Sequence, residues 1–334
     1  MVSSTNDGRA RQAWGPGVLA ARQYATANVL LALGALSLLV GGWMPFAVIV
    51  LILAFGSFAD ELSGEDLDRL GERGRAFYNA NLYLSLPLMC LLAVLLAVFA
   101  RDASFTDQPL QAIGAIWVAG YLFALVGATV GHELAHRQGW ILQAAAHVLL
   151  GFTLNPSFVL YHVHVHHRRV GSYDDASTAR RGERLLVFFG RAVYRQFEQA
   201  AAVEAMRLRR KGIRVWSYRN RLILGFAAPI SIVAALALVG GPRAVLFFGL
   251  AALIGRFFHE LINFVQHYGL VRAENAPIRP RHSWDCYHRL SNVLHYNLPR
   301  HSDHHMFAVK PFWDLDIAED VPLLPYGYQT MGSI

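Results

Sequence analysis

Long apolar stretches alternate with short polar ones through most of this chain. Six of them approach the roughly 20 residues that a helix needs to cross the hydrocarbon core of a bilayer. They are residues 25–41, 43–59, 81–100, 110–130, 222–239 and 244–263. Glycines separate the first two stretches, and Gly240-Gly241-Pro242 separates the last two, as in tight turns. The pattern predicts an all-α integral membrane protein whose six transmembrane helices form three hairpins.

Two further segments do not fit this scheme of crossings. Residues 140–160 are apolar enough to resemble a span, but a crossing there would separate the histidines before and after it. Because Asn155-Pro156 interrupts the segment, we expect it to be re-entrant or to lie in the membrane plane. Leu185–Arg210 has apolar residues on one side and arginines on the other, which predicts an amphipathic helix at the lipid headgroups.

We expect a single domain over residues 1–334. It would comprise an N-terminal tail (1–24), the spans (25–263) with a cytoplasmic insert (131–221), and a C-terminal cytoplasmic cap (264–334). No signal peptide is expected, because the first apolar run starts late and leads directly into the second. The cap must fold back over the spans if its histidines are to meet the others.

The charge distribution agrees with a membrane protein. The net charge of +7 would permit a nucleic-acid partner. With a cytoplasmic N-terminus, however, the outward loops hold little beyond Arg101 and Arg243. The inward segments hold nearly all other basic residues, among them Arg9, Arg11, Arg22, Arg69, Arg73, Arg75, Arg207, Arg209, Arg210 and Lys211. This asymmetry predicts both termini on the cytoplasmic side of the plasma (inner) membrane, with lipid and not nucleic acid as the partner.

The two cysteines exclude several kinds of site. Cys90 lies within an apolar stretch and Cys286 in the polar C-terminal part, so no disulfide framework is implied. The chain has no Cys-x-x-Cys pair, and therefore carries no iron–sulfur or rubredoxin module of its own. Any electrons for redox chemistry must come from another protein.

Nine histidines form short clusters. They are His132 and His136; His162, His166 and His167; His267; and His301, His304 and His305. Spacings of three or four place neighbouring imidazoles on one face of a helix. Nine imidazoles exceed what one tetrahedral ion can use, so the clusters predict two metal ions. The six-span topology places every cluster at the cytoplasmic end.

The ligand chemistry narrows the metal. Histidine without nearby cysteine suits iron or zinc better than copper(I), and manganese is not excluded. Glu260 and Asn263 lie close to the stripe that ends at His267, so they are candidates to orient ligands. Asp303 could accept an imidazole N–H, or could equally cap a helix or be solvated. Arg256 is expected to neutralise Glu260 at i, i+4.

Other interpretations remain open. His132-Glu133-Leu134-Ala135-His136 matches the H-E-x-x-H signature of zinc proteases, in which Glu is the general base. On a helix, however, Glu133 points about 100° away from the histidine face. A membrane metalloprotease is therefore the minority hypothesis, and a non-enzymatic metal carrier a weaker one. The remaining histidines that we considered are expected to be structural: His147, His164, His282, His288 and His295.

The four clusters together resemble those of the membrane-bound alkane monooxygenases, which are part of the fatty-acid desaturase and hydroxylase superfamily. The strings that carry the resemblance are HELAHR (132–137), HVHVHH (162–167), NFVQHYG (263–269) and RHSDHH (300–305). PRHSW (280–284) and LPYGY (324–328) look similar to the family as well. The resemblance extends over roughly residues 60–331.

The resemblance implies that the nine clustered histidines hold two iron ions without a bridging carboxylate. It implies O2-dependent hydroxylation of a methyl group, with electrons from a rubredoxin or a ferredoxin-type reductase and an apolar substrate, an alkane or an alkyl-aromatic. A desaturase of the same superfamily is the alternative. Val163 and Gln266 depart from the alkane branch, and glutamine before HYG looks more like the xylene monooxygenase branch. The RHSDHH string looks more like the alkane branch. The reaction type is therefore better supported than the substrate.

Overall fold

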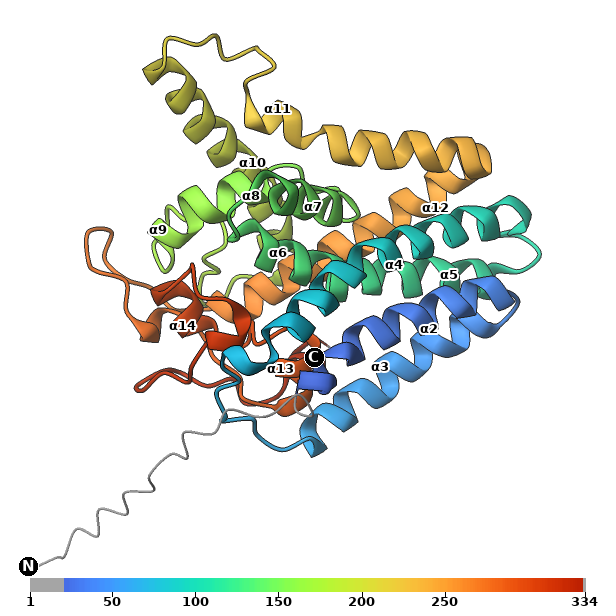
Figure 1. Ribbon diagram of the computed structural model, residues 1–334, viewed down its shortest axis with the longest axis horizontal. Helices are drawn as coiled ribbons and strands as arrows, with labels where there is room; N and C mark the ends of the chain where they lie inside the picture. Colours follow the sequence, from blue (N-terminus) through green and yellow to red (C-terminus); the bar gives the residue numbers. More distant parts are fainter. Residues whose placement is uncertain (1–20, 333–334) are drawn as a thin grey trace, which may run out of the picture.

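The computed structural model describes residues 21–332, and within them the regular elements are helices (Figure 1). Two isolated β-bridges join Glu65 to His288 and Asp285 to Leu323. Most of the expected N-terminal tail, including Arg9 and Arg11 of the charge argument, lies outside the described residues. The predicted helical class is confirmed.

The first two long helices form the predicted hairpin. Helix α2 (Thr26–Val40) follows a short turn, η1 (Arg22–Ala25), and α3 (Met44–Leu62) returns beside it. Gly41 and Gly42 both have positive φ, 72° and 57°, a conformation that other residues rarely adopt. The glycines therefore permit the tight reversal that the sequence indicates.

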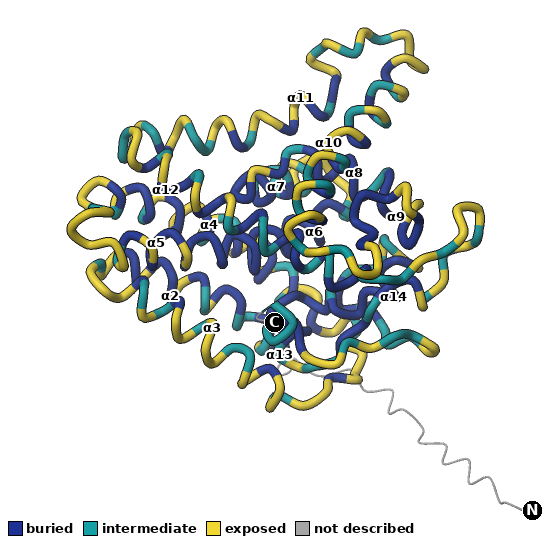
Figure 2. The backbone as a smooth tube through the Cα atoms, turned by 180° about the vertical axis from the view of Figure 1, so that it is seen from behind, coloured by how far each residue is buried: buried dark blue, intermediate teal, exposed yellow. Residues whose placement is uncertain are grey.

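The next two long helices form the centre of the bundle. Helix α4 (Arg75–Asp102) follows η2 (Glu72–Gly74). Helix α5 (Pro109–Leu122) continues through a π-helical turn, η3 (Phe123–Ala128), into α6 (Thr129–Ala135). Small residues allow close packing here: a Cβ added at Gly120 would lie 2.6 Å from the carbonyl oxygen of Ala251, which belongs to the long helix described next. Figure 2 shows the buried backbone of this centre surrounded by exposed outer helices.

The last apolar region differs from the prediction. One helix, α12 (Ala227–His267), extends over both predicted spans, after the short α11 (Arg221–Gly225). Its two arms meet at Gly241, which has a φ of 66°, and Figure 1 shows them fold back on each other. Among the described residues the structure therefore has five helices long and apolar enough to cross a membrane, where the sequence predicted six. The predicted turn is present, but no loop separates the arms.

The stretch between the first two histidine clusters folds as short helices. Helix α7 (Trp140–Gly151) has 12 residues, a length of about 18 Å, which is too short to cross a membrane. Helix α8 (Phe158–Tyr161), the π-helical turn η4 (His162–His166) and α9 (His167–Arg169) follow the break at Asn155-Pro156. The chain thus returns to the end of the bundle from which it left. This agrees with the expectation that residues 140–160 do not cross.

Helix α10 (Leu185–Arg210) has the predicted bounds. The C-terminal segment consists of η5 (Pro280–His282), α13 (Arg289–Leu294), α14 (His301–Met306), η6 (Phe312–Asp314) and α15 (Tyr328–Met331). The buried Asp60 carboxylate of α3 holds this segment in place, accepting hydrogen bonds from the Ser291 backbone and hydroxyl and from the Gln329 backbone. The segment therefore packs against the same end of the bundle that carries the histidines.

Candidate metal centre

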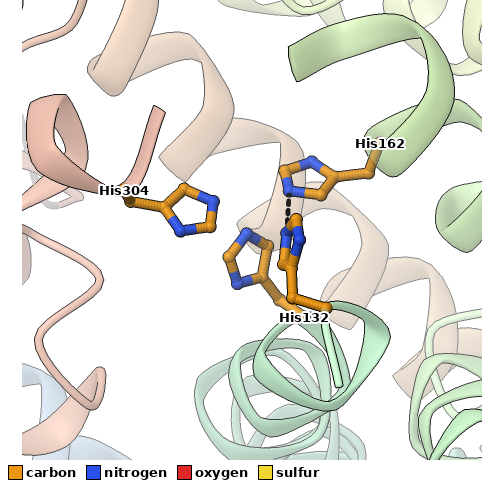
Figure 3. A group of neighbouring side chains, drawn as sticks. His132, His162 and His304 are labelled. Carbon is orange, nitrogen blue, oxygen red and sulfur yellow. Dashed lines mark hydrogen bonds between the residues drawn. The ribbon is translucent and has the colours of Figure 1, made fainter. Parts of the chain in front are cut away.

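The nine clustered histidines meet at one end of the helix bundle. The first group contains His132 of α6, His136 directly after it, His162 of η4 and His304 of α14. One potential ligand atom from each lies within 4.8 Å of the others. Figure 3 shows His132, His162 and His304 approaching a common centre from three separate elements. Segments 172 residues apart in sequence thus supply one cluster (132 to 304).

A second group lies beside the first and is fully buried. It contains His166 of η4, His267 at the end of α12, and His301 and His305 of α14, again with ligand atoms within 4.8 Å of one another. His267 and His301 approach with their Nε2 atoms 3.1 Å apart, and those of His301 and His305 are 3.0 Å apart. The expectation that the separated clusters converge is therefore met.

His167 belongs to neither group by that criterion, but it contacts the first. Its Nε2 atom lies 3.0 Å from Nε2 of His162 and 3.1 Å from Nε2 of His304. The π-helical turn explains this position, because its hydrogen bonds join residues five apart, and the His167 N–H donates to the His162 carbonyl. His162 therefore shares a face with His167, whereas α-helical spacing predicts His166.

Helix α14 also divides its histidines between the groups. On an α-helix, a residue four positions later is offset by about 40° and one three positions later by about −60°. His304 and His305 therefore lie on opposite sides of His301. His304 joins the first group, while His301 and His305 join the second. The clusters in the sequence are thus not the clusters in space.

The nitrogen atoms fit metal ions better than they fit hydrogen bonds between imidazoles. A neutral imidazole nitrogen has one in-plane site, either an N–H or a lone pair. The Nε2 atoms of His162, His167 and His301 each lie 3.0–3.1 Å from two other Nε2 atoms. Each can form a hydrogen bond with only one of these two neighbours. Nitrogens bound at about 2.1 Å to one ion, at right angles, lie about 3.0 Å apart.

Two buried nitrogens without a protein partner support the same conclusion. Nε2 of His132 in the first group and Nε2 of His166 in the second are buried and accept no hydrogen bond from the described residues. A buried polar atom left without a partner is destabilising, so such atoms are rare unless a ligand satisfies them. The Nδ1 atoms of His167, His267, His301 and His305 are also buried without a partner among the described residues, so the ring nitrogens alone do not count the ions. A metal ion in each group would satisfy the two orphaned Nε2 atoms.

Burial keeps three of the clustered imidazoles neutral, those of His136, His304 and His305. It lowers the pKa of His136 to about 4, with further contributions from His166 and Arg137. Burial and neighbouring imidazoles also hold the pKa of His304 and the pKa of His305 well below the ordinary value. A neutral imidazole keeps the lone pair that binds a metal. His136, His304 and His305 are therefore in their metal-binding protonation state at neutral pH.

A carboxylate that the sequence analysis overlooked orients the second group. Oδ2 of Asp175 lies 3.0 Å from Nδ1 of His166, and the Tyr161 hydroxyl donates to Oδ1 of the same carboxylate. Burial alone would raise the pKa of Asp175, but His166 and Tyr161 bring it down to about 2. The ionised carboxylate fixes the tautomer of His166 and directs Nε2 toward the group. No motif indicated this residue, because it lies in the irregular segment after α9.

The carboxylates that the sequence did single out have other partners. Asp303 forms an ion pair with Lys310 at 2.9 Å and accepts from the Asp316 backbone N–H. It is therefore neither a solvated group nor an acceptor for imidazole among the described contacts. Glu260 accepts from Asn263 at 3.1 Å and lies 3.0 Å from Arg256, the ion pair expected from the sequence.

Glu133 is not placed as a protease base. Its carboxylate forms an ion pair with Arg137, at 2.5 Å, and accepts from the Phe312 backbone N–H at 3.3 Å. Arg137 in turn stacks over the Trp313 ring at 4.6 Å. The glutamate thus joins α6 to the C-terminal segment, away from the histidine face.

The histidines expected to be structural lie outside both groups. They are His147, His164, His282, His288 and His295. His164 lies 3.4 Å from Arg221, and His288 lies 3.3 Å from Glu61. His295 has a role that the sequence did not indicate, because it lines the cavity described next. No motif or helical spacing in the sequence links His295 to the clustered histidines, so nothing in the sequence indicates this position.

An apolar cavity of about 340 Å³ leads to both groups. It follows one face of α5, η3 and α6, from Trp117 past Tyr121 to His132, a distance of about 22 Å at 1.5 Å per residue. Phe258 of α12 lies on another wall, and His301 of the second group also lines the cavity. A slender apolar molecule could therefore reach both histidine groups from within the bundle.

Comparison with known proteins agrees with this architecture. Residues 108–334 match the fatty acid desaturase family. Alkane 1-monooxygenase 1 of Pseudomonas aeruginosa is 30% identical over 299 residues, covering 86% of this chain and 78% of that enzyme. Alkane 1-monooxygenase 2 of the same organism is 34% identical over 224 residues, covering 66% of this chain and 59% of that enzyme.

A third relative acts on a different substrate. The xylene/toluene monooxygenase hydroxylase component XylM of Pseudomonas putida is 30% identical over 250 residues, covering 75% of this chain and 68% of that protein. Residues 108–334 contain both histidine groups and most of the residues that line the cavity; Leu53 and Ser57 of α3 line it from outside the matched region. The chain belongs to the fatty acid desaturase family.

Proposed function

We propose that this chain is a membrane-bound monooxygenase that uses two histidine-bound iron ions to hydroxylate a methyl group of an apolar substrate. The observation that carries the proposal is the apolar cavity, which ends at residues of both histidine groups: His132 and His162 of the first and His301 of the second. The monooxygenase names of the relatives support the same reaction class.

In this proposal the nine histidines divide into five and four. His132, His136, His162, His167 and His304 hold one ion, and His166, His267, His301 and His305 hold the other. Bound iron would supply the activation of O2. Imidazole ligands alone give the site no anionic donor. Within residues 21–332, the carboxylate hydrogen-bonded to a proposed ligand is that of Asp175, through Nδ1 of His166. Its charge partly balances the cations from outside the ligand set.

The chain's own contribution is to position the substrate. The walls between Trp117 and Ala128 are apolar, so an alkyl chain or a methylated ring loses little by leaving the membrane. The narrow cavity presents the end of such a molecule to the histidine groups and excludes water from it. A terminal or benzylic methyl group is thus the group that meets the site.

The membrane arrangement is part of the proposal. The two arms of α12, reversed at Gly241, count as two passages, which gives six in all. The histidine end then faces the cytoplasm of a bacterial inner membrane, with both termini on that side, as the arginine distribution indicates. Electrons come from a separate donor, a rubredoxin or a ferredoxin-type reductase, because the chain has no cysteine pair for a redox centre.

Product analysis tests the reaction. The purified chain in lipid, with iron, a reductase and rubredoxin, is given octane, p-xylene and a fatty acid, and the products are identified by mass spectrometry with 18O2. We expect an alcohol that carries one 18O atom. An alkene without the label would identify a desaturase, and no NADH-dependent O2 consumption with any reductase would indicate a metal carrier.

Metal analysis separates the protease alternative. We expect about two iron ions per chain, whereas a zinc protease would hold about one zinc and no iron. The ion pair of Glu133 with Arg137 already disfavours that alternative, since the carboxylate of a general base must face the metal-bound water.

A further inference from the structure

The last turn of α10 and the segment that joins it to α11 have an unusual charge. From residue 205 to residue 221 the chain has seven arginines and lysines and no aspartate or glutamate. Arg207 and Arg221 pair with the buried Glu204 of α10. The other five are exposed and form no ion pair within residues 21–332: Arg209, Arg210, Lys211, Arg214 and Arg219. We call residues 209–219 the basic loop.

The basic loop also exposes two large aromatic side chains. Trp216 is 85% exposed and Tyr218 is 75% exposed. Tryptophan and tyrosine are typical of the membrane–water interface, where the ring is apolar and its N–H or O–H remains hydrated. Arg219 lies over the Tyr218 ring at 5.6 Å, so the charge and the aromatic group occupy one surface. Two exposed rings among five cations that form no ion pair within residues 21–332 indicate an interface with a polar, anionic partner.

The position of the basic loop selects the membrane as that partner. The Asn220 side chain accepts from the backbone N–H groups of Leu222 and Ile223, which fixes the start of α11 one residue after the loop. Apolar residues 221–267 follow directly. Figure 1 shows the loop at the edge of the fold, away from the helix bundle and beside the beginning of α11. Basic clusters in this juxtamembrane position bind anionic headgroups.

Helix α10 extends the same surface. Tyr194 and Met206 are exposed, and Phe197 is 43% exposed although its ring lies 6.2 Å from that of Phe226, next to α11. Apolar side chains exposed beside a basic loop are typical of a helix that lies in the headgroup region. A water-soluble acidic protein could contact the same side chains. The apolar helix that begins at Arg221, directly after the loop, favours the membrane instead.

We propose that the basic loop binds the headgroups of anionic phospholipids and anchors the end of α10 to the membrane surface. The inference depends on the chain being embedded in a bilayer but not on iron or on hydroxylation. It predicts that the fraction of anionic lipid around Trp216 is higher than the average fraction in the bilayer. Each lysine or arginine near an anionic surface adds to the free energy of binding. This electrostatic attraction is screened at 1 M salt, where the Debye length is about 3 Å.

The experiment uses the full chain in phosphatidylcholine vesicles that contain one fifth phosphatidylglycerol. Two vesicle samples are compared: in one the phosphatidylglycerol carries bromine on its acyl chains, and in the other an equal amount of the phosphatidylcholine does. Bromine quenches the fluorescence of a tryptophan that it contacts. The difference between the native chain and Trp216→Phe isolates the signal of Trp216. We expect brominated phosphatidylglycerol to quench this signal about twofold more than brominated phosphatidylcholine, and 1 M salt to abolish the difference.

A charge-matched pair of triple variants tests the cause. Arg210→Gln, Lys211→Gln and Arg214→Gln together should remove the preference for phosphatidylglycerol. The control carries the same loss of charge at other exposed arginines, Arg279→Gln, Arg281→Gln and Arg289→Gln, and should keep it. Circular dichroism verifies that each variant is folded.

Three results would overturn the proposal. They are equal quenching by the two lipids, the same loss of preference in both triple variants, and absence of Trp216 quenching by either lipid. Loss of binding to an acidic electron-transfer protein, with the lipid preference intact in the loop variant, would assign the loop to that protein instead. None of these measurements needs turnover, so a failure of the hydroxylation assay leaves them interpretable.

Discussion

Nδ1 of His166 lies 3.0 Å from Oδ2 of Asp175, and both side chains are buried. This pair joins the second histidine group to a hydrogen-bonded network that includes the Tyr161 hydroxyl and the Thr178 hydroxyl. The carboxylate is nine residues away in sequence, outside every histidine motif. Its position makes it the group that sets the direction of Nε2 of His166 and a negative charge in direct contact with a proposed ligand.

Asp175→Asn should weaken metal binding at the second group. The asparagine keeps the volume of the side chain but loses the charge, and removal of such a partner typically lowers metal affinity 10–100-fold. We expect iron per chain to fall by about one ion after dialysis against a chelator, with a matching loss of hydroxylation. Asp174→Asn is the control, because Asp174 is the exposed neighbour. Equal iron retention in the two variants would show that Asp175 only supports the fold.

Removal of one predicted ligand should affect both iron and activity. His136→Ala, His166→Ala and His304→Ala each leave one nitrogen fewer in a group, so we expect hydroxylation to fall below about 1% and iron content to drop. His147→Ala is the control, since His147 lies outside both groups. Iron is measured by plasma mass spectrometry on detergent-purified protein. Native activity in any of the first three variants would contradict the ligand assignment.

The cavity makes a steric prediction. Ala128 lines it four residues before His132, so Ala128→Phe should block the approach to the histidine groups. We expect turnover of long alkanes to fall at least about tenfold while iron content stays unchanged, because no ligand is altered. Val98→Phe adds similar bulk to the outer surface of α4 and should have no effect. Equal rates for the two variants across a series of alkane lengths would mean that substrate enters by another route.

Features that depend on residues close together in sequence were predicted, and features that depend on distant residues were not. Spans and hairpins depend on local hydropathy and on glycines, so the α2–α3 turn and the bounds of α10 were predicted. Six separated spans were not found, because Gly241 and Pro242 let α12 reverse without a loop. Hydropathy reports the turn but cannot tell a kinked helix from two helices.

The site shows the same limit. The sequence identified all nine clustered histidines, but it could not divide them into groups. The π-helical turn at His162 aligns residues five apart, so His167 takes the place that α-helical spacing gives to His166. Asp175 and His295 reach the site only through tertiary packing, and no spacing rule indicates them.

Glu204 allows a prediction about pH. Its buried carboxylate accepts from Arg207 and Arg221 and from the Arg221 backbone N–H. Burial would raise the pKa of Glu204, but these donors lower it from 4.5 to about 2. A carboxylate with a lowered pKa stabilises the fold above its unfolded pKa, and this stabilisation is lost as the pH falls from about 4.5 toward 2. The shift corresponds to at most about 3 kcal/mol.

Glu204→Gln should therefore lower the thermal unfolding midpoint at neutral pH, and the gap from the native chain should narrow only below about pH 4.5. Glutamine leaves two arginines without a charged partner where α10 meets α11, which is the physical reason for the loss. Glu198→Gln on the exposed side of α10 should show no gap at any pH. The midpoints are measured in detergent by circular dichroism. A gap that stays constant down to about pH 3 would mean that packing, rather than charge, is responsible.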